Sequence, residues 1–160
     1  MTGRGWRAAI LALSLAPTLS LAACGSPAVT APEQAETARL EANKQLVLAM
    51  WHEVIDGRNI DAARKYMATD YKQNSPSAPN GVEALIAFLH TEFPDSQPLP
   101  PGYPLTKFEF VLAEGNLVQL MFQREIPDPK EAGKTLRVWW YDTYRVKDGK
   151  IVEHWDSALD

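Results

Sequence analysis

Five prolines between Pro94 and Pro104 divide this chain into two parts with different hydrophobic periods. Proline lacks a backbone N–H and holds φ nearly fixed, so neither a helix nor a central strand can continue through such a segment. Before the prolines, apolar residues recur at helical spacing, and after them they alternate with polar residues. Helices followed by strands predict an α+β domain, with the helices on one face of an antiparallel sheet.

Three helices are predicted before the prolines. Apolar residues at i, i+4 spacing predict a long amphipathic helix over residues 35–55, which ends at Gly57. We expect Asn59 to cap a short second helix from Ile60 to about Met67. The segment Asn80-Gly81-Val82-Glu83 is similar to a capping box and predicts the start of a third helix.

Four antiparallel strands are predicted after the prolines, over residues 108–112, 117–124, 136–146 and 151–157. Glu114-Gly115-Asn116 is typical of a turn between the first two strands. Asp148-Gly149 is a strong hairpin signal between the last two. The order of these elements indicates a meander that forms one curved sheet.

The N-terminus is typical of an exported lipoprotein. Arg4 and Arg7 precede an apolar run that ends in Leu21-Ala22-Ala23-Cys24, and Cys24 is the only cysteine of the 160 residues. This pattern predicts a signal peptide over residues 1–23 and a diacylglycerol on the thiol of Cys24. The alternative is an ordinary cleaved signal followed by an incidental cysteine.

The predicted organisation has three parts: the signal peptide 1–23, the lipidated Cys24 with a flexible tether over residues 24–34, and one domain over residues 35–160. The protein is thus expected to be anchored to the bacterial cell envelope through its lipid. Gly25 after the cysteine favours the outer membrane where the cell has one.

Charge and motifs exclude several classes of function. A net charge of −4, with scattered basic residues, argues against nucleic-acid binding. The sequence has no GxGxxG, P-loop or GxSxG motif. His52-Glu53 begins like a zinc-protease motif, but the second histidine is missing. We therefore predict neither a cofactor nor a metal.

Asp142 lies in the middle of an otherwise largely apolar face of the third predicted strand, which includes Trp140 and Tyr144. A buried carboxylate is costly unless its pKa rises or a donor satisfies it. A raised pKa would make Asp142 a general acid or base near neutral pH. Alternatively, a hydrogen bond from Tyr144, a histidine or a backbone amide satisfies it, or solvent covers this face.

The partner of Asp142 depends on the turn at Asp148-Gly149. A two-residue turn places Asp142 opposite Trp155. A bulged turn places it opposite His154, with Asp156 beside that histidine, and creates an Asp–His pair able to relay a proton. Both alternatives remain open at the level of sequence.

Two segments resemble the SnoaL-like family, whose members have the nuclear transport factor 2-like fold. The run from Asp142 to Asp156 is similar to the closing hairpin of that family. Tyr71-Lys72-Gln73-Asn74-Ser75-Pro76 is similar to its loop before the third helix. The resemblance implies a cone of three N-terminal helices and a curved antiparallel sheet around an apolar pocket, often in homodimers. Members include polyketide cyclases that work by aldol condensation without a cofactor.

The resemblance also implies roles for particular residues. By position, Asp142 matches the pocket aspartate that acts as acid or base, and His154 is its expected partner. Asn74, Met121 and Gln123 stand where close members carry histidines, so any chemistry rests on Asp142 with His154. The residues expected to line the pocket are Trp51, Tyr71, Asn74, Met121, Trp140, Tyr144 and Trp155.

Two functions follow as hypotheses. In the first, the domain binds a small, largely apolar molecule, with cofactor-free cyclase-like or isomerase-like chemistry at Asp142. In the second, it is a non-catalytic envelope binding or assembly module whose pocket is filled by its own side chains. A cavity of roughly 300 Å³ or more beside the carboxylate favours a ligand.

The outer face of the predicted sheet suggests a partner of another kind. Trp139 and Tyr141 point away from Asp142, so they are exposed unless something covers them. We expect a homodimer through this face. The alternative is partial cover by the long side chains of Arg137 and Arg145.

Overall fold

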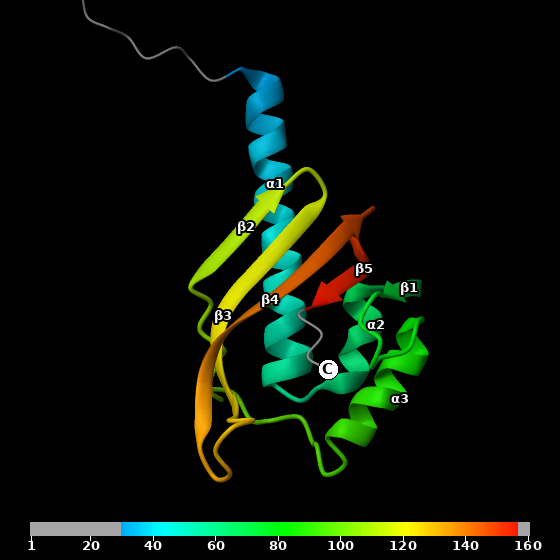
Figure 1. Ribbon diagram of the computed structural model, residues 1–160. Coiled ribbons are helices and arrows are strands. Elements are labelled where there is room, and N and C mark those ends of the chain that lie inside the picture. The colour runs from blue at the N-terminus through cyan, green and yellow to red at the C-terminus, as the bar shows by residue number, and fades with distance from the viewer. Residues whose placement is uncertain (1–29, 157–160) are drawn as a thin grey trace, which may run out of the picture.

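The computed structural model describes residues 30–156, and its helices lie on one face of a five-stranded sheet (Figure 1). The strands are β1 (Met67–Gln73), β2 (Phe110–Glu114), β3 (Leu117–Pro127), β4 (Thr135–Lys147) and β5 (Lys150–Asp156), in the spatial order β1-β5-β4-β3-β2. Neighbouring strands are antiparallel except β1 and β5. This arrangement confirms the predicted α+β class and the four-stranded meander.

The predicted signal peptide, Cys24 and the first part of the tether lie outside the described residues. Within residues 30–156, no helix combines the length and the apolar character needed to cross a membrane.

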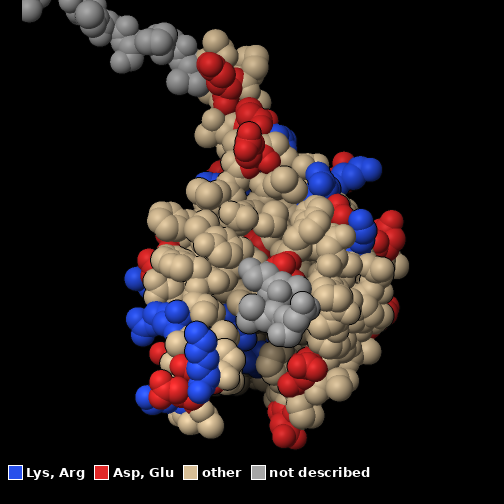
Figure 2. All heavy atoms as spheres, in the orientation of Figure 1, with Lys and Arg blue, Asp and Glu red and all other residues tan. Residues whose placement is uncertain are grey.

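Helix α1 (Ala31–Met50) begins earlier than predicted. The Glu33 carboxylate accepts a 2.7 Å hydrogen bond from the Thr30 backbone N–H, and a proline lies in the first turn. Residues 31–34, predicted as tether, are therefore helical. The first turns of α1 project beyond the sheet, and acidic side chains are prominent on them (Figures 1 and 2).

The long helix does not stay regular to Ile55 as predicted. After Met50 it continues as a π-helix over Trp51–Asp56. The N–H of Gly57 reaches back to the carbonyl of His52, at 2.8 Å, and the Tyr103 hydroxyl donates to the same carbonyl at 2.7 Å. A Cβ at Gly57 would lie 2.7 Å from that hydroxyl and 2.8 Å from the backbone carbonyl oxygen of Glu53, so this close packing requires glycine.

The second helical segment is a 3₁₀ turn (Ile60–Ala62) followed by α2 (Ala63–Tyr66). Asn59 occupies the predicted N-cap position, but its side chain makes no capping hydrogen bond and its amide donates to Glu53 Oε1 at 2.9 Å instead. Helix α3 (Val82–Glu92) is present as predicted, but the capping box is wrong. The Asn80 side chain accepts a 2.8 Å hydrogen bond from the backbone N–H of Gln73 and so stabilises a strand rather than the helix.

Strand β1 has no counterpart among the predicted strands. It contains Tyr71 and Gln73, for which a loop is expected, and it pairs in parallel with β5. Its burial does not alternate, and its partner lies about 80 residues away in sequence. A strand defined by such a distant partner has no strong local signal.

The β4–β5 hairpin combines features of both predicted registers. Asp148 and Gly149 both have positive φ, and the turn between Lys147 and Lys150 has two residues. The register then shifts by one residue on β5, between the Val146–Ile151 and Arg145–Glu153 pairs. Asp142 consequently lies opposite Asp156, so both predicted partners, Trp155 and His154, were wrong as directly facing residues.

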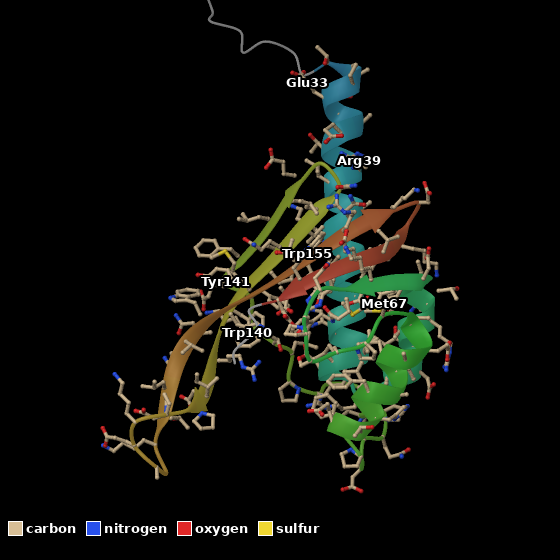
Figure 3. The ribbon with its side chains drawn as sticks, turned by 45° about the vertical axis from the view of Figure 1, so that its right-hand side comes forward. Glu33, Arg39, Met67, Trp140, Tyr141 and Trp155 are labelled. Carbon is tan, nitrogen blue, oxygen red and sulfur yellow. The ribbon has the colours of Figure 1, made fainter. Side chains whose placement is uncertain are left out.

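Alternation along β4 separates two faces of the sheet. Trp140, Asp142 and Tyr144 face the helices, whereas Trp139 and Tyr141 lie on the outer face. Figure 3 labels one residue of each set, Trp140 and Tyr141. The core forms between the inner face and the helices, with Val47, Met50, Val54, Val118, Leu120 and Ile151 among its most buried members.

Candidate functional site

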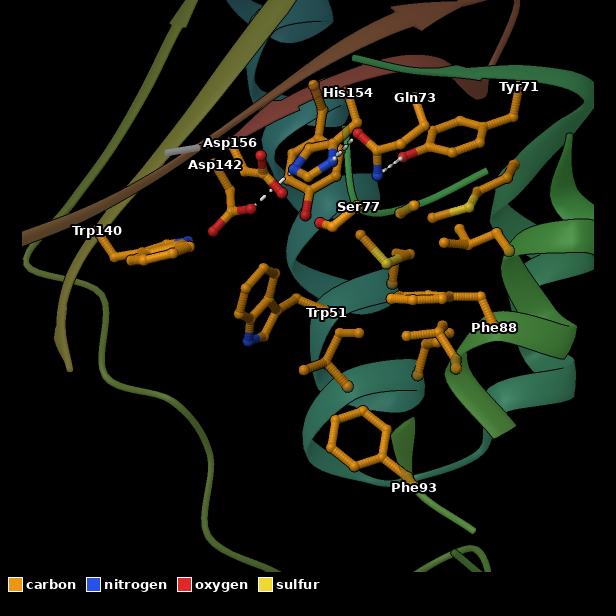
Figure 4. Close-up of a pocket in the computed structure, with 18 of the residues that line it drawn as sticks. Trp51, Tyr71, Gln73, Ser77, Phe88, Phe93, Trp140, Asp142, His154 and Asp156 are labelled. Atoms are coloured by element: carbon orange, nitrogen blue, oxygen red, sulfur yellow. Dashed lines mark hydrogen bonds and ion pairs between the residues drawn. The ribbon is translucent and has the colours of Figure 1, made fainter. Parts of the chain in front are cut away.

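A cavity of about 470 Å³ lies between the helices and the inner face of the sheet (Figure 4). Its wall is mostly apolar and aromatic, with contributions from the π-helix, α3 and the four strands β1, β3, β4 and β5. Six of the residues predicted for the site line it: Trp51, Tyr71, Trp140, Asp142, Tyr144 and His154. The volume exceeds the threshold that favours a ligand-binding pocket over a filled core.

Asp142 and His154 form a buried pair on the cavity wall (Figure 4). His154 Nε2 lies 2.7 Å from Asp142 Oδ1, and the two residues are 6% and 4% exposed. The residues come from neighbouring strands, and the register shift on β5 brings them together diagonally. Of the two alternatives that the sequence left open, the Asp–His pair is therefore the one present, as a diagonal contact rather than between directly facing residues.

The hydrogen bonds of Gln73 determine the tautomer of His154. The backbone N–H of Ser75 donates to Gln73 Oε1 at 3.0 Å, which identifies that atom as the amide oxygen. The same oxygen lies 3.1 Å from His154 Nδ1, so Nδ1 carries a proton and donates it. In a neutral imidazole, Nε2 is then a bare acceptor facing the Asp142 carboxyl.

This network requires a proton between the two partners. A bare Nε2 and an ionised carboxylate would both be acceptors at 2.7 Å, which is repulsive. Asp142 and His154 therefore share one proton, either as carboxylic acid with imidazole or as carboxylate with imidazolium. In both forms the pair is neutral overall, which suits its burial.

Burial raises the pKa of the Asp142 carboxyl, and the hydrogen bond from His154 opposes this rise. The charge of Asp156 on the facing strand raises the pKa of Asp142 further. A carboxyl with a raised pKa exchanges protons more readily near neutral pH than an ordinary surface aspartate.

Two tyrosines complete the polar end of the cavity. The Tyr144 ring stacks on His154 with centroids 4.5 Å apart, and the Tyr71 hydroxyl accepts a 3.3 Å hydrogen bond from Gln73 Nε2. Burial raises the pKa of both phenols well above the ordinary value. They are thus protonated at neutral pH and hold the histidine and the amide in place.

Four buried side-chain polar atoms in the described residues have no hydrogen-bond partner, and all four belong to residues that line this cavity. They are Trp51 Nε1, Arg58 Nη1, Asp142 Oδ2 and Asp156 Oδ1. Buried polar groups in folded proteins are nearly always paired, because an unpaired group costs about 1–3 kcal/mol. Their concentration in one cavity indicates a place where a ligand completes the hydrogen bonding.

Three predicted pocket residues lie elsewhere. Asn74 donates to Glu153 Oε1 and to the carbonyl of His154, so it ties β1 to β5. Met121 and Trp155 lie on the outer face of the sheet, because alternation turns them away from the helices. Arg145 lies over the Trp155 ring.

The prediction missed two arginines, Arg58 and Arg124, which line the cavity. Arg124 follows Leu120 and Phe122 at a spacing of two on β3, and that alternation could have placed it on the inner face. Arg58 lies between two helical segments, where the sequence carries no comparable signal.

Asp142, His154 and Asp156 are also close enough to be considered as metal ligands, with ligand atoms within 4.8 Å of one another. However, His154 Nε2 and Asp142 Oδ1 bond each other directly at 2.7 Å. A metal ion bound by both atoms would take the place of the proton that they share.

Comparisons with known proteins bear on the fold and the family. Residues 48–154 match the model of the SnoaL-like domain. No curated protein matches the sequence significantly.

Several solved structures resemble the chain. One is a candidate polyketide cyclase from Acidithiobacillus ferrooxidans, 21% identical, with a TM-score of 0.52 over 72% of this chain and 87% of that chain. A candidate SnoaL-like polyketide cyclase from Jannaschia sp. CCS1 is 21% identical, with a TM-score of 0.54 over 73% and 85%. An LEH-like epoxide hydrolase from M. tuberculosis is 15% identical, with a TM-score of 0.53 over 74% and 83%. At these identities the similarity establishes a common fold.

Proposed function

Because the chain belongs to the SnoaL-like domain family, with the nuclear transport factor 2-like fold, we propose that it binds a small, largely apolar molecule between its helices and sheet. We propose further that Asp142, paired with His154, acts on that molecule as a general acid and base without a cofactor. The reaction class is proton transfer next to a carbonyl group, as in an aldol-type cyclisation or an isomerisation.

The observation that carries the binding proposal is the set of unpaired polar atoms on a largely apolar cavity wall. Trp51 Nε1 and Arg58 Nη1 are donors, whereas the free oxygens of Asp142 and Asp156 act as acceptors when ionised. An apolar body with a few oxygen functions matches both the wall and these atoms.

The observation that carries the chemical proposal is the free Oδ2 of Asp142 beside the shared proton. With that proton on His154, the Asp142 carboxylate can remove a proton from the carbon next to a carbonyl. The C–H electron pair becomes an enolate, whose carbon attacks a second carbonyl of the same molecule. The resulting alkoxide takes the proton back from Asp142, so atoms and charges balance.

The alternative is a non-catalytic envelope module with a filled core. The cavity of about 470 Å³ and its unpaired atoms support the ligand-binding proposal instead. A binding protein without catalysis would keep the cavity but have no need of a titrating Asp142.

Hydrogen–deuterium exchange tests the chemical step without knowledge of the natural substrate. The probe is 2-tetralone, an apolar ketone with acidic protons next to its carbonyl, incubated with the purified full-length protein in D₂O. We expect exchange above the buffer rate, and a loss of about 100-fold or more in the protein-dependent rate in Asp142→Asn.

The matched control is Asp148→Asn, which removes the same charge from an exposed turn where asparagine fits the positive φ. Equal exchange rates for the wild type and Asp142→Asn would refute the acid–base proposal. In that case binding of the ketone, followed by calorimetry, would still decide the binding proposal.

We also propose that the mature protein is anchored to the cell envelope through lipid on Cys24 and acts as a homodimer. The lipoprotein-like sequence pattern over residues 1–24 supports the anchor. The exposure of Trp139 and Tyr141, at 46% and 38%, supports a partner on the outer face of the sheet. Arg137 turns toward Glu125, and Arg145 lies over Trp155. These arginines therefore do not cover the rings of Trp139 and Tyr141.

A further inference from the structure

The arginines of the described residues fall into two groups. Four of them, Arg39, Arg64, Arg137 and Arg145, form ion pairs with glutamate or aspartate. The two that form no ion pair among residues 30–156, Arg58 and Arg124, are the two that line the cavity, and each lies over an aromatic ring. The protein has more acidic than basic residues, so acidic partners are plentiful. Even so, the two arginines that face the cavity have none within the described residues.

Arg58 occupies an unusual position. Its backbone φ is 58°, in the left-handed region that a residue with a side chain adopts at a cost. Its guanidinium carbon lies 3.7 Å from the centre of the Phe93 ring, and its Nη1 is buried without a hydrogen-bond partner. Arg58 also lines a second hollow together with Asp95, but no ion pair joins these two residues.

The two cations mark different regions of the cavity. Arg124 lies over the Trp140 ring, and Arg58 lies over the Phe93 ring. Trp140 is next to Asp142, whereas Phe93 is at the far end of the cavity from Asp142 (Figure 4). Arg124 is exposed, so water and salt screen its charge. Arg58 Nη1 is buried, so a charged partner there would be screened much less.

From this arrangement we propose that the molecule bound in the cavity carries a carboxylate, which Arg58 binds at the Phe93 end. This inference rests on the proposed binding function and names its substrate class: an apolar carbonyl compound with a carboxylate at the end remote from the reacting centre. A carboxylate is planar and carries one negative charge, which matches a single guanidinium with a free donor.

The proposal also gives the carboxylate a role in orientation. With its anionic end on Arg58, the apolar body lies against Trp51 and Phe88, and the other end reaches Asp142 (Figure 4). The reverse orientation would place a carboxylate against Asp142 and Asp156, which is unfavourable whenever either is ionised. The charges at the two ends of the cavity thus select one orientation of the bound molecule. The apolar wall alone would accept both orientations.

The experiment compares two probes of the same shape, 2-naphthoate and naphthalene-2-carboxamide, by calorimetric titration of the purified full-length protein. We expect 2-naphthoate to bind about tenfold or more tightly than the amide, because a hydrogen bond to a charged group gains that much. Arg58→Asn should abolish this preference, because both probes then meet the same uncharged side chain. Asparagine suits the left-handed backbone, so this variant should fold.

Arg137→Gln is the matched control, because it removes the same charge from an exposed position on the outer face of the sheet. It should change neither affinity by more than about twofold. Arg124→Gln should weaken binding of 2-naphthoate by less than Arg58→Asn does.

The outcomes separate this inference from the proposed function. If the wild type binds both probes equally, or if the preference survives in Arg58→Asn, the carboxylate proposal is wrong while small-molecule binding stands. A larger loss in Arg124→Gln than in Arg58→Asn would also overturn it. If the wild type binds neither probe, both the inference and the binding function fail.

Discussion

Asp142 and His154 are 2.7 Å apart although they do not face each other across the β4–β5 ladder. Asp142 pairs with Asp156 and His154 pairs with Tyr144, so the contact is diagonal. Alternation along β4 places Asp142 on the inner face of the sheet, and the register shift on β5 brings His154 to the same face. The acid–base pair of the candidate site therefore depends on a local irregularity of the backbone rather than on a regular hairpin.

The first prediction concerns the pH dependence of stability. The folded state raises the pKa of Asp142 above its ordinary value of 3.8, so the folded protein binds this proton more tightly than the unfolded chain. The contribution of Asp142 to stability is fully present below pH 3.8 and is lost as the pH rises through the higher folded pKa. In Asp142→Asn this loss of stability with rising pH should be absent, because asparagine does not titrate.

Urea denaturation at a series of pH values checks this. The free energy of unfolding of the wild type, relative to that of Asp142→Asn, should fall with rising pH above 3.8. Asp148→Asn should show no such trend relative to the wild type. The raised pKa would be contradicted if the free energy of unfolding of the wild type, relative to that of Asp142→Asn, increased with pH.

The second prediction concerns the tautomer of His154. Gln73→Leu removes the acceptor that holds the proton on Nδ1, at 3.1 Å. The Nδ1 tautomer then loses its advantage, and we expect the proton to move to Nε2, facing an ionised Asp142. Imidazole ¹⁵N shifts of His154 report this change directly. Gln119→Leu, on the outer face where Gln119 bonds Thr143, is the control and should leave them unaltered.

The third prediction concerns the cost of Arg58. Arg58→Asn relieves the left-handed backbone and removes a buried unpaired donor, at the expense of the contact with Phe93. We expect the free energy of unfolding to rise by about 1 kcal/mol without ligand. If Arg58→Asn is more stable but binds carboxylates more weakly, Arg58 lowers the stability of the wild type in exchange for ligand binding. A fall of about 1 kcal/mol instead would mean that Arg58 is there for structure.

The fourth prediction concerns the outer face of the sheet. Phe110 and Leu112 are each 53% exposed, and Trp139 and Tyr141 lie on the same face. Trp139→Glu places a charge in this apolar surface and should convert a dimer into a monomer in sedimentation velocity. Thr91→Glu, exposed on α3, adds the same charge elsewhere and should leave the dimer intact. A wild-type protein that sediments as a monomer would refute the dimer proposal.

The fifth prediction concerns the anchor. Cys24→Ser removes the thiol that would carry the diacylglycerol, so labelled fatty acid should not be incorporated and the membrane fraction should lose the protein. Ser26→Ala, two residues along, is the control and should be labelled normally. Lipid labelling of Cys24→Ser would disprove attachment at this cysteine.

Much of the fold could be predicted because its signals are local. Proline placement, helical spacing and alternation are properties of neighbouring residues, and they predicted three helical segments and the β2–β5 meander. The exceptions depended on distant partners. β1 exists because it pairs with β5, and the π-helix forms where Gly57 and Tyr103 both reach the His52 carbonyl.

The candidate site was predictable in part for the same reason. Alternation along β4 is enough to place Trp140, Asp142 and Tyr144 on one face. Alternation also excludes Met121 and Trp155 from that face, but only once the register of each strand is known. Asn74 was assigned to the pocket by family resemblance, and its actual hydrogen bonds lie with β5.

The order of the amino acids is sufficient to establish the α+β class and the position of a carboxylate on an apolar strand face. It also predicts the leader. Three-dimensional packing was needed to establish that His154 shares a proton with Asp142, that Gln73 sets the tautomer, and that Arg58 faces the cavity unpaired. The difference is one of range. Periodicity follows from a few residues of one chain segment, whereas hydrogen bonding and desolvation depend on which segments meet, and a one-residue register shift changes every contact beyond it.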